Sequence, residues 1–488
     1  MNGRQQDARY ITTTLPYVNA DPHIGFALEV VQADILARYW ASQGHEVFFN
    51  TGTDEHGVKI LRKAQEQSIE PQQYVDEWAA KFRMLKEKLD LFPDLHFVRT
   101  TDPHHEAAAQ EFWRRCAAAG DIYKKNYQVK YCVGCELEKT ESELQSGRCP
   151  LHPNLDIETI DEENYFIRFS RYEKPLLDLY ARYPDFVVPE QRFNEIRAFV
   201  GRGLEDFSIS RLASKMPWGV PVPGDPQQVM YVWFDALVNY ISTLGWPEDT
   251  AQFEEFWGTD HSPHAVQVAG KDNLRQQSAM WQAMLMAASL PPTRRIFIHG
   301  FITSGGQKMS KSLGNVIDPY ALVQEYGADA LRFFLTRHIS PFEDSDFTME
   351  RFKEAYNADL ANGLGNQAAR IMKLAQDNLD GPVELSAESL QLQKSFCDHL
   401  DRYDFNAAAA LVWEHIAKAD AFIQEKKPFS LVKADETREE GKQIIGKLVG
   451  HLAMIATHLA PIMPETAAKI MTAIKENKKP ENLFLRKE

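Results

Sequence analysis

Strand-like and helix-like segments alternate in the first part of the chain, and this order favours a parallel sheet covered by helices. Residues 9–15 are β-prone, and apolar side chains then recur at helical spacing from Ile24 to Trp40. A second strand-like run covers residues 46–51, and helical patterns follow over about residues 58–90. Because parallel strands need crossover connections, this order predicts an α/β fold with a doubly wound sheet of the Rossmann type.

The alternation breaks at about residue 115 and resumes after a proline-rich stretch at 217–226. We expect a subdomain inserted into the sheet between these points, and strand patterns at 229–233, 265–268 and 295–299 then predict the second half of the sheet. Beyond about residue 350 long amphipathic helical patterns dominate, which predicts a helical bundle. The expected domains are a first half-core (1–114), an insert (115–220), a second half-core (221–300), a linker (301–350) and a helical domain (351–488).

Composition and charge exclude several classes of protein. Lysine and arginine number 54 against 69 acidic residues, so the net charge is −15 and nucleic acid must meet a local patch. No run of about 18 apolar residues occurs, and the first ten residues lack the apolar core of a secretory signal. We therefore expect a cytoplasmic protein with no membrane segment.

Three cysteines and one histidine have the spacing of a zinc site. Two residues separate Cys132 from Cys135, two separate Cys149 from His152, and thirteen lie between the pairs. Three thiolates and an imidazole in this pattern are typical of tetrahedral zinc, and four protein ligands leave no position open for catalysis. The sequence predicts one structural zinc ion per chain.

Two distant segments suit a polyphosphate. His23 and Gly25 lie where the first helix is expected to begin, with Asp21 as its cap, and a helix N-terminus attracts phosphate. Far downstream, a glycine pair precedes Lys308 and Lys311. Such a glycine hinge with two lysines could fold over bound phosphates and neutralise a leaving group.

Six motifs follow one another along the chain: TLPYVNADPHIG at 14–25, TDEHG at 53–57, YVWFDALVNY at 231–240, AGKD at 269–272, HGF at 299–301 and KMSKS at 308–312. In sequence and in order they resemble the class I aminoacyl-tRNA synthetases, and within that class the methionyl-tRNA synthetase family. The resemblance implies a Rossmann catalytic core with a zinc-bearing connective insert, a linker with the KMSKS loop, and a helical anticodon-binding domain. It also implies a ligase that uses ATP with Mg²⁺ to convert L-methionine to methionyl adenylate. Methionine then passes to the terminal ribose of tRNA(Met).

The resemblance further assigns individual residues. The implied catalytic groups are His23, Lys308 and Lys311, and the implied ATP-binding residues add Gly25, Gly270 and Asp272. Asp54 would receive the methionine ammonium and Arg211 would position the substrate, beside a side-chain pocket formed by Leu15, Tyr17, Trp233, Ala236, Tyr240 and Gln277. The implied anticodon contacts are Asn362, Arg370 and Phe429.

Several positions depart from the family pattern. Phe26 replaces a histidine. Asn273 stands where the family usually has an apolar residue, and Gln276 and Gln277 stand where it has phenylalanine and histidine. Phe429 replaces a tryptophan; phenylalanine can still stack on a base but lacks the indole donor. We expect a more polar wall in the methionine pocket.

Other functions explain parts of the chain. Ligases of the same class for leucine, isoleucine or valine carry a large editing insert, for which about 100 residues between the half-cores leave little room. A non-catalytic RNA-binding relative would not need both KMSKS lysines, and a small nucleotidyltransferase would leave the helical third unexplained. Because the sequence ends at LFLRKE without an added dimerisation module, we expect a monomer.

Overall fold

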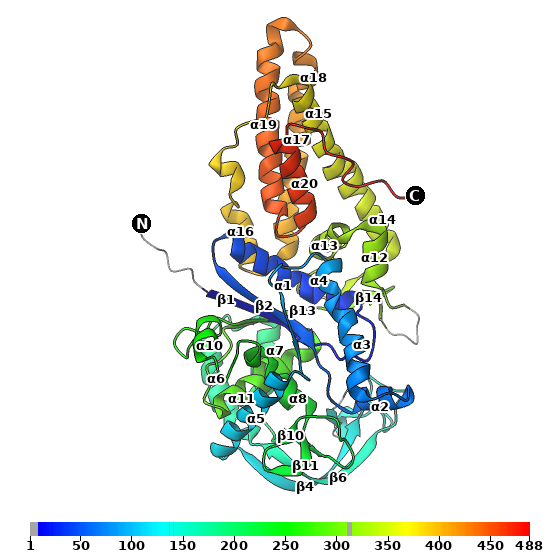
Figure 1. Ribbon diagram of the computed structural model, residues 1–488, viewed down its shortest axis with the longest axis vertical. Coiled ribbons are helices and arrows are strands. Elements are labelled where there is room, and N and C mark those ends of the chain that lie inside the picture. The colour runs from blue at the N-terminus through cyan, green and yellow to red at the C-terminus, as the bar shows by residue number, and fades with distance from the viewer. Residues whose placement is uncertain (1–7, 136, 140, 310–314) are drawn as a thin grey trace. The chain divides into compact units, whose positions relative to one another are not determined.

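The computed structural model describes residues 8–135, 137–139, 141–309 and 315–488 (Figure 1). The chain divides into two compact units. The first unit comprises Met1–Pro22, His45–Met84 and Asp94–Ile298, and the second comprises His23–Gly44, Leu85–Pro93 and His299–Glu488.

A six-stranded parallel sheet forms the centre of the first unit, in the order β3-β2-β1-β12-β13-β7. Its strands are β1 (Ala8–Thr13), β2 (Glu46–Thr53), β3 (His96–Arg99), β7 (Val187–Val188), β12 (Val266–Gly270) and β13 (Arg295–His299). The chain builds outward from β1 to β3, and the later strands β7, β12 and β13 lie on the other side of β1, so the topological switch point lies between β1 and β12. Ligands of such sheets bind at the carboxyl ends of the strands beside this point. The predicted doubly wound α/β core is confirmed.

The pairing of β1 continues past the end of the strand. β1 is in register with β12 at Ile11 and Val266, and both Tyr10 and Ile11 are fully buried, as expected for a strand covered on both faces. Tyr17 forms an isolated parallel bridge with Asp54 beyond the ends of β1 and β2. The segment after β1 therefore lies against the loop after β2.

Helices and two antiparallel sheets complete the first unit. Its α-helices are α2 (Val58–Glu66), α3 (Pro71–Arg83), α5 (Pro103–Ala118), α6 (Glu173–Arg182), α7 (Glu190–Val200), α8 (Val232–Ala236), α9 (Asn239–Ser242), α10 (Thr250–Phe256) and α11 (Trp281–Ala287). Shorter turns are the 3₁₀ segments η1 (Glu141–Glu143), η2 (Phe169–Tyr172) and η3 (Lys271–Asn273), and the π-helix η4 (Gln276–Met280). A four-stranded sheet has the order β5-β4-β6-β8, with β4 (Ile122–Cys132), β5 (Leu137–Lys139), β6 (Glu158–Ile167) and β8 (Phe207–Ser208). A three-stranded sheet has the order β10-β11-β9, with β9 (Ser210–Leu212), β10 (Pro221–Val222) and β11 (Asp225–Met230).

Some local predictions differ from the structure. The strand expected at 229–233 in the central sheet ends at Met230 and belongs instead to the three-stranded antiparallel sheet. Residues 276–280, which directly precede α11, form the π-helix η4, which was not predicted. The edge strand β7 was not predicted, because a strand of two residues carries no periodic signal.

The second unit is mainly helical, as predicted for the C-terminal third. Its helices are α1 (Ile24–Ser42), α4 (Leu85–Lys88), α12 (Pro319–Tyr326), α13 (Ala328–Arg337), α14 (Met349–Ala355), α15 (Asn366–Asn378), α16 (Lys394–Leu400), α17 (Phe405–Lys426), α18 (Pro428–Leu431), α19 (Arg438–Leu459) and α20 (Pro464–Lys475). It also contains the π-helix η6 (Tyr356–Gly365), the 3₁₀ turns η7 (Ala387–Leu390) and η8 (Asp435–Thr437), and a small sheet of β14 (Ile302–Ser304), β15 (Gln307–Lys308) and β16 (Ser345–Asp346). The long helices α17 and α19 run beside α15 and α20 in Figure 1. Within the described residues, no helix has the length and apolar character needed to cross a membrane.

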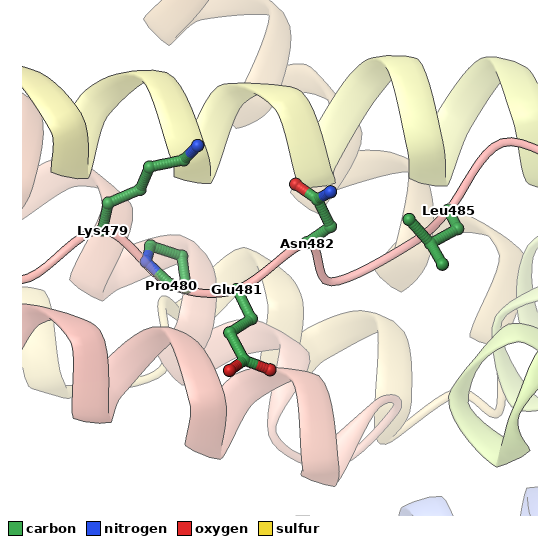
Figure 2. A pocket seen from close by; sticks show the side chains of 5 residues that line it. All are labelled: Lys479, Pro480, Glu481, Asn482 and Leu485. Atoms are coloured by element: carbon green, nitrogen blue, oxygen red, sulfur yellow. The ribbon is translucent and has the colours of Figure 1, made fainter.

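The chain beyond α20 returns along the bundle as an extended segment. The amide of Lys479 donates to Gln376 Oε1 at 2.8 Å, and Tyr356 OH donates to the carbonyl of Leu485 at 2.9 Å. The side chain of Asn357 exchanges two hydrogen bonds with the backbone of Lys487, at 2.8 and 2.9 Å. A pocket of about 500 Å³ lies along this segment, and Figure 2 shows the side chains that line it, Lys479, Pro480, Glu481, Asn482 and Leu485.

Candidate active site

Asp54 lies beside Tyr17 at the carboxyl end of the central sheet. The amide of Asp54 donates to the carbonyl of Pro16 at 3.0 Å, and the side chain of Asp54 is buried. The indole Nε1 of Trp233 donates to the hydroxyl of Tyr17 at 2.9 Å. Leu15 is half-buried in the same segment as Tyr17. The structure thus joins an acidic residue and three apolar or aromatic residues that the sequence assigned to one site.

The neighbouring Glu55 fixes the loop that carries Asp54. Its two carboxylate oxygens accept hydrogen bonds from Arg99 at 2.7 and 2.8 Å. Its amide donates to Thr100 Oγ1 at 2.9 Å, and its carbonyl accepts from Trp218 Nε1 at 2.7 Å. Because the charge and the backbone groups of this fully buried residue are all satisfied, the adjoining Asp54 is held in a defined position.

A buried ion pair connects the same loop to α8. His56 Nδ1 lies 3.2 Å from Asp235 Oδ2, and the two side chains are 3% and 0% exposed. Burial opposes a charge on His56, but the carboxylate of Asp235, together with those of Glu106 and Glu55, outweighs burial and raises the pKa of His56. Burial raises the pKa of Asp235. Sequence reasoning assigned no role to this pair, although both residues lie inside the quoted motifs TDEHG and YVWFDALVNY.

Tyr240 and Gln277 are also brought together. Gln277 Nε2 donates to the hydroxyl of Tyr240 at 2.8 Å, and the carbonyl of Tyr240 accepts from Tyr10 OH at 2.8 Å. The rings of Tyr240 and Trp281 meet edge to face at 5.8 Å. Gln277 is 2% exposed, and its Oε1 accepts no hydrogen bond from any described residue. Ala236 is buried at the end of α8.

Arg211 is held by its own strand and by aromatic rings. Its Nη1 donates to Ser208 Oγ and to the carbonyl of Ser210, both at 2.8 Å. Its guanidinium lies 4.4 Å from the ring centre of Tyr231 and 5.3 Å from that of Tyr131. These contacts fix a buried cation in the first unit.

Gly270 and Asp272 follow the strand on the other side of the switch point. Gly270 is buried at the end of β12, and Asp272 is exposed in the 3₁₀ turn η3. Because β12 pairs with β1, both residues lie at the edge of the sheet where doubly wound folds bind ligands.

His23, not Asp21, caps the first helix. His23 Nδ1 accepts from the amides of Gly25 and Phe26 at 3.1 and 3.3 Å, whereas Asp21 pairs with Lys81 at 2.9 Å. The prediction of an Asp21 cap was therefore wrong, because the helix begins at Ile24, two residues later than a helix capped by Asp21 would begin. A Cβ atom on Gly25 would lie 3.0 Å from the His23 ring, so glycine suits this contact. With Nδ1 as acceptor, the neutral imidazole carries its proton on Nε2.

The glycine pair before the KMSKS sequence forms a hairpin turn. Gly305 and Gly306 have φ of 62° and 72° between the antiparallel strands β14 and β15, as in a type I′ turn. The amide of Gly306 donates to Asp346 Oδ1 at 2.8 Å. Lys308 ends β15, and Lys311 lies outside the described residues. The expected glycine hinge is thus a defined turn tied to β16.

Cys132, Cys135, Cys149 and His152 converge as one group that could hold a metal ion. Their ligand atoms all lie within 4.8 Å of one another. Sγ of Cys135 is 3.5 Å from Sγ of Cys149 and 3.2 Å from Nδ1 of His152. A Cβ atom on Gly134 would lie 2.4 Å from the His152 ring, so the turn accommodates this imidazole only with glycine at that position.

In the second unit, Arg370 and Phe429 are brought together. The guanidinium of Arg370 lies 6.0 Å from the ring centre of Phe429, whose side chain is 36% exposed. Asn362 is exposed on the π-helix η6 that precedes α15. An exposed aromatic ring beside a cation has the chemistry to stack an unpaired base.

Comparisons with known proteins agree on one family. A family model described as class I tRNA synthetases (M) matches residues 9–156 and 137–372. The methionine–tRNA ligase of Thermosynechococcus vestitus is 43% identical over 477 residues, which cover 94% of this chain and 88% of that protein. The methionine–tRNA ligase of Thermotoga maritima is 38% identical over 491 residues, which cover 98% of this chain and 76% of that protein.

Solved structures give the same result. Methionyl-tRNA synthetase of Mycobacterium tuberculosis in complex with methionyl-adenylate superposes with a TM-score of 0.87 at 33% identity, covering 99% of each chain. The apo form of that enzyme gives a TM-score of 0.83 at 31% identity over 100% of each chain. These similarities extend across both units. The chain therefore belongs to the methionyl-tRNA synthetase family, the class I tRNA synthetases that ligate methionine to transfer RNA.

Proposed function

We propose that the first unit activates methionine at the site around Asp54. The buried Asp54 carboxylate receives the substrate ammonium, and Arg211 orients the substrate. The thioether side chain contacts Leu15, Tyr17, Trp233, Ala236, Tyr240 and Gln277. Two features support this assignment: a buried acid beside an aromatic wall matches an amino acid that carries a cation next to an apolar chain, and aromatic rings favour contact with sulfur.

The first chemical step joins methionine to ATP. A methionine carboxylate oxygen attacks the α-phosphorus, the bond from this phosphorus to the bridging oxygen breaks, and pyrophosphate leaves. The Nε2 proton of His23 and the positive N-terminus of α1 behind Gly25 stabilise negative charge on the phosphates, and Lys308 and Lys311 neutralise the leaving group. Mg²⁺, when bound with ATP, neutralises further phosphate charge. Because no side chain forms a covalent bond, catalysis consists of positioning and electrostatic stabilisation.

The ATP ribose is held at the switch point of the central sheet. Gly270 allows the backbone to approach the nucleotide, and the Asp272 carboxylate accepts hydrogen bonds from the ribose hydroxyls. The position of both residues after β12 supports this role.

The second step transfers methionine to tRNA(Met). The terminal ribose hydroxyl attacks the methionyl carbonyl, an ester forms and AMP leaves. Phe429 stacks on an anticodon base, Arg370 offers a neighbouring cation, and Asn362 supplies hydrogen bonds. The exposed Phe429 ring beside Arg370 supports this assignment.

Zinc is the metal that best fits the cysteine and histidine group. At Zn–S of about 2.3 Å and Zn–N of about 2.0 Å, tetrahedral ligands lie about 3.5 to 3.8 Å apart. The separations of 3.2, 3.5 and 3.8 Å between ligand atoms of Cys132, Cys135, Cys149 and His152 lie near this range. Four protein ligands give the ion a structural role, in which it fixes the turn between β4 and β6.

The juxtaposition of buried Asp54 with Tyr17 and Trp233 is the observation that carries the function. The test is ATP-dependent attachment of labelled methionine to transfer RNA, measured as an acid-precipitable, base-labile ester. We expect methionine tRNA to be charged by the wild type, and charging by Asp54→Asn to fall by about two orders of magnitude, because a paired charge is lost. Absence of any ester with the wild type, or full activity of Asp54→Asn, would contradict the proposal.

A further inference from the structure

Two ionisable side chains join the Asp54 loop to the helix that carries Trp233 and Ala236. His56 is in the loop and Asp235 is in α8, with 3.2 Å between Nδ1 and Oδ2. Both side chains are almost completely inaccessible, and no described residue donates a well-aligned hydrogen bond to the Asp235 carboxylate. A buried acid with a single compensating cation strongly resists separation from it, since separation leaves an uncompensated charge.

The surroundings of His56 favour its charged form. Besides Asp235, the groups that act on His56 are the carboxylates of Glu55 and Glu106 and the imidazole of His105. Burial, followed by the neighbouring histidines, lowers the pKa of His105 to about 3, so His105 is neutral at physiological pH. Its Nδ1 lies 3.0 Å from Ser242 Oγ. The carboxylates around His56 thus favour a charge on His56, whereas burial keeps His105 neutral.

The loop has two independent anchors that point to different parts of the first unit. Glu55 binds Arg99 and Thr100 at the end of β3, which fixes the loop to the sheet. His56 instead reaches α8, whose Trp233 and Ala236 belong to the proposed side-chain site for methionine. Loss of the His56 contact would therefore leave the loop attached to the sheet and release its link to α8.

We propose that His56 and Asp235 are a positioning pair that sets the spacing between the ammonium site at Asp54 and the α8 wall of the methionine site. This inference rests on the proposed function. A fixed spacing between a charge receptor and an apolar wall discriminates among amino acids by side-chain length. A single methylene group is worth about a factor of 10 to 200 in such a site when the walls do not move.

The test compares methionine with ethionine, which is one methylene longer, in ATP–pyrophosphate exchange. The variants are Asp235→Asn, His56→Ala and His56→Gln. Asp121→Asn is the matched control, because Asp121 is a buried acid of the same unit, 2.8 Å from Arg171, and has no assigned role in the site. For each variant kcat and KM are measured for both amino acids, with KM for ATP and the melting temperature.

Asp235→Asn and His56→Ala should raise KM for methionine about tenfold or more, and leave KM for ATP within about twofold. They should also lower the preference for methionine over ethionine in kcat/KM about fivefold. His56→Gln, whose amide can still donate to Asp235, should stay within about threefold of the wild type in both quantities.

If His56 and Asp235 only stabilise the fold, their variants should lower the melting temperature without changing how the site binds methionine. If the variants lower the melting temperature as Asp121→Asn does but keep the wild-type KM for methionine and the wild-type preference over ethionine, the positioning role is wrong. If His56→Ala does not fold, Asp235→Asn decides by the same two quantities. Absence of methionine-driven exchange in the wild type would instead refute the proposed function, and the inference with it.

Discussion

Arg332 and Asp34 form an ion pair in which both side chains are fully buried, with 2.6 Å between Nη2 and Oδ2. The same guanidinium donates to the carbonyls of Leu89, Pro461 and Ile462 at 3.2, 2.9 and 2.8 Å. One arginine on α13 therefore joins α1, the segment after α4 and the segment before α20. This arrangement fixes the helix that His23 caps within the second unit.

Asp34→Asn should destabilise the protein by about 3 to 5 kcal/mol, because removing one partner leaves the Arg332 cation buried without compensation. Urea denaturation followed by circular dichroism measures this loss. The matched control is Asp90→Asn, since Asp90 is a half-exposed acid 4.0 Å from Arg38. A loss for Asp34→Asn no larger than that of the control would show that the pair does not hold α1.

The stability of the helical bundle should fall in mild acid through His415. Its Nε2 lies 3.1 Å from Gln393 Oε1, and burial, aided by His451 and His458, lowers the pKa of His415 to about 4. An unfolded histidine has a pKa of about 6.5. The neutral His415 therefore contributes fully to the free energy of unfolding above that pH, and this contribution is lost as the pH falls toward 4. The loss should be on the order of 2 to 3 kcal/mol.

Urea titrations between pH 4 and pH 7 measure this dependence. His415→Gln should flatten the curve, because glutamine does not take up a proton in this range. His261→Gln, at an exposed histidine, should keep the wild-type curve. Equal slopes for His415→Gln and the wild type would contradict the assignment.

Gly134→Ala should abolish metal binding without removing a ligand. The added Cβ would lie 2.4 Å from the His152 ring, so the imidazole would have to leave the group. Zinc measured by elemental analysis should fall from about one ion per chain to about a tenth of that in Gly134→Ala and in Cys149→Ser. Cys397→Ser, at a cysteine outside the group, should retain zinc. Full zinc content in Gly134→Ala would show that His152 is not a ligand.

Phe429→Ala should weaken the step that uses transfer RNA and spare the activation of methionine. Base stacking on an aromatic ring is worth about 1 to 3 kcal/mol, so KM for transfer RNA should rise about five- to hundredfold. ATP–pyrophosphate exchange should be unchanged, and Phe429→Trp should match or improve on the wild type. Leu390→Ala, at another exposed apolar residue of the second unit, is the control. An unchanged KM for Phe429→Ala would assign Phe429 to packing alone.

The sequence predicted those parts of the fold that have a long periodic pattern. The strand at 295–299 agrees with β13, and the helical pattern from Ile24 to Trp40 agrees with α1. Periodicity does not reveal which sheet a short strand joins, so the run at 229–233 was placed in the wrong sheet and β7 was missed. The π-helix η4 was missed for a similar reason, because its hydrogen bonding alters a helix without changing its apolar pattern.

Some residues of the candidate site could likewise be predicted from the sequence, and others could not. The metal ligands follow from spacing alone, since short loops bring such pairs together. The roles of Glu55, His56 and Asp235 depend on burial and on contacts between distant segments, which a loop sequence such as TDEHG does not encode. The His23 cap was missed because aspartate is the more common capping residue.

The decisive measurement is ATP–pyrophosphate exchange driven separately by each of the twenty amino acids, on protein of known zinc content. We expect exchange with methionine alone, at a site that tolerates Gln277 beside Tyr240. Exchange driven by another amino acid, or none at all from zinc-loaded protein, would contradict it.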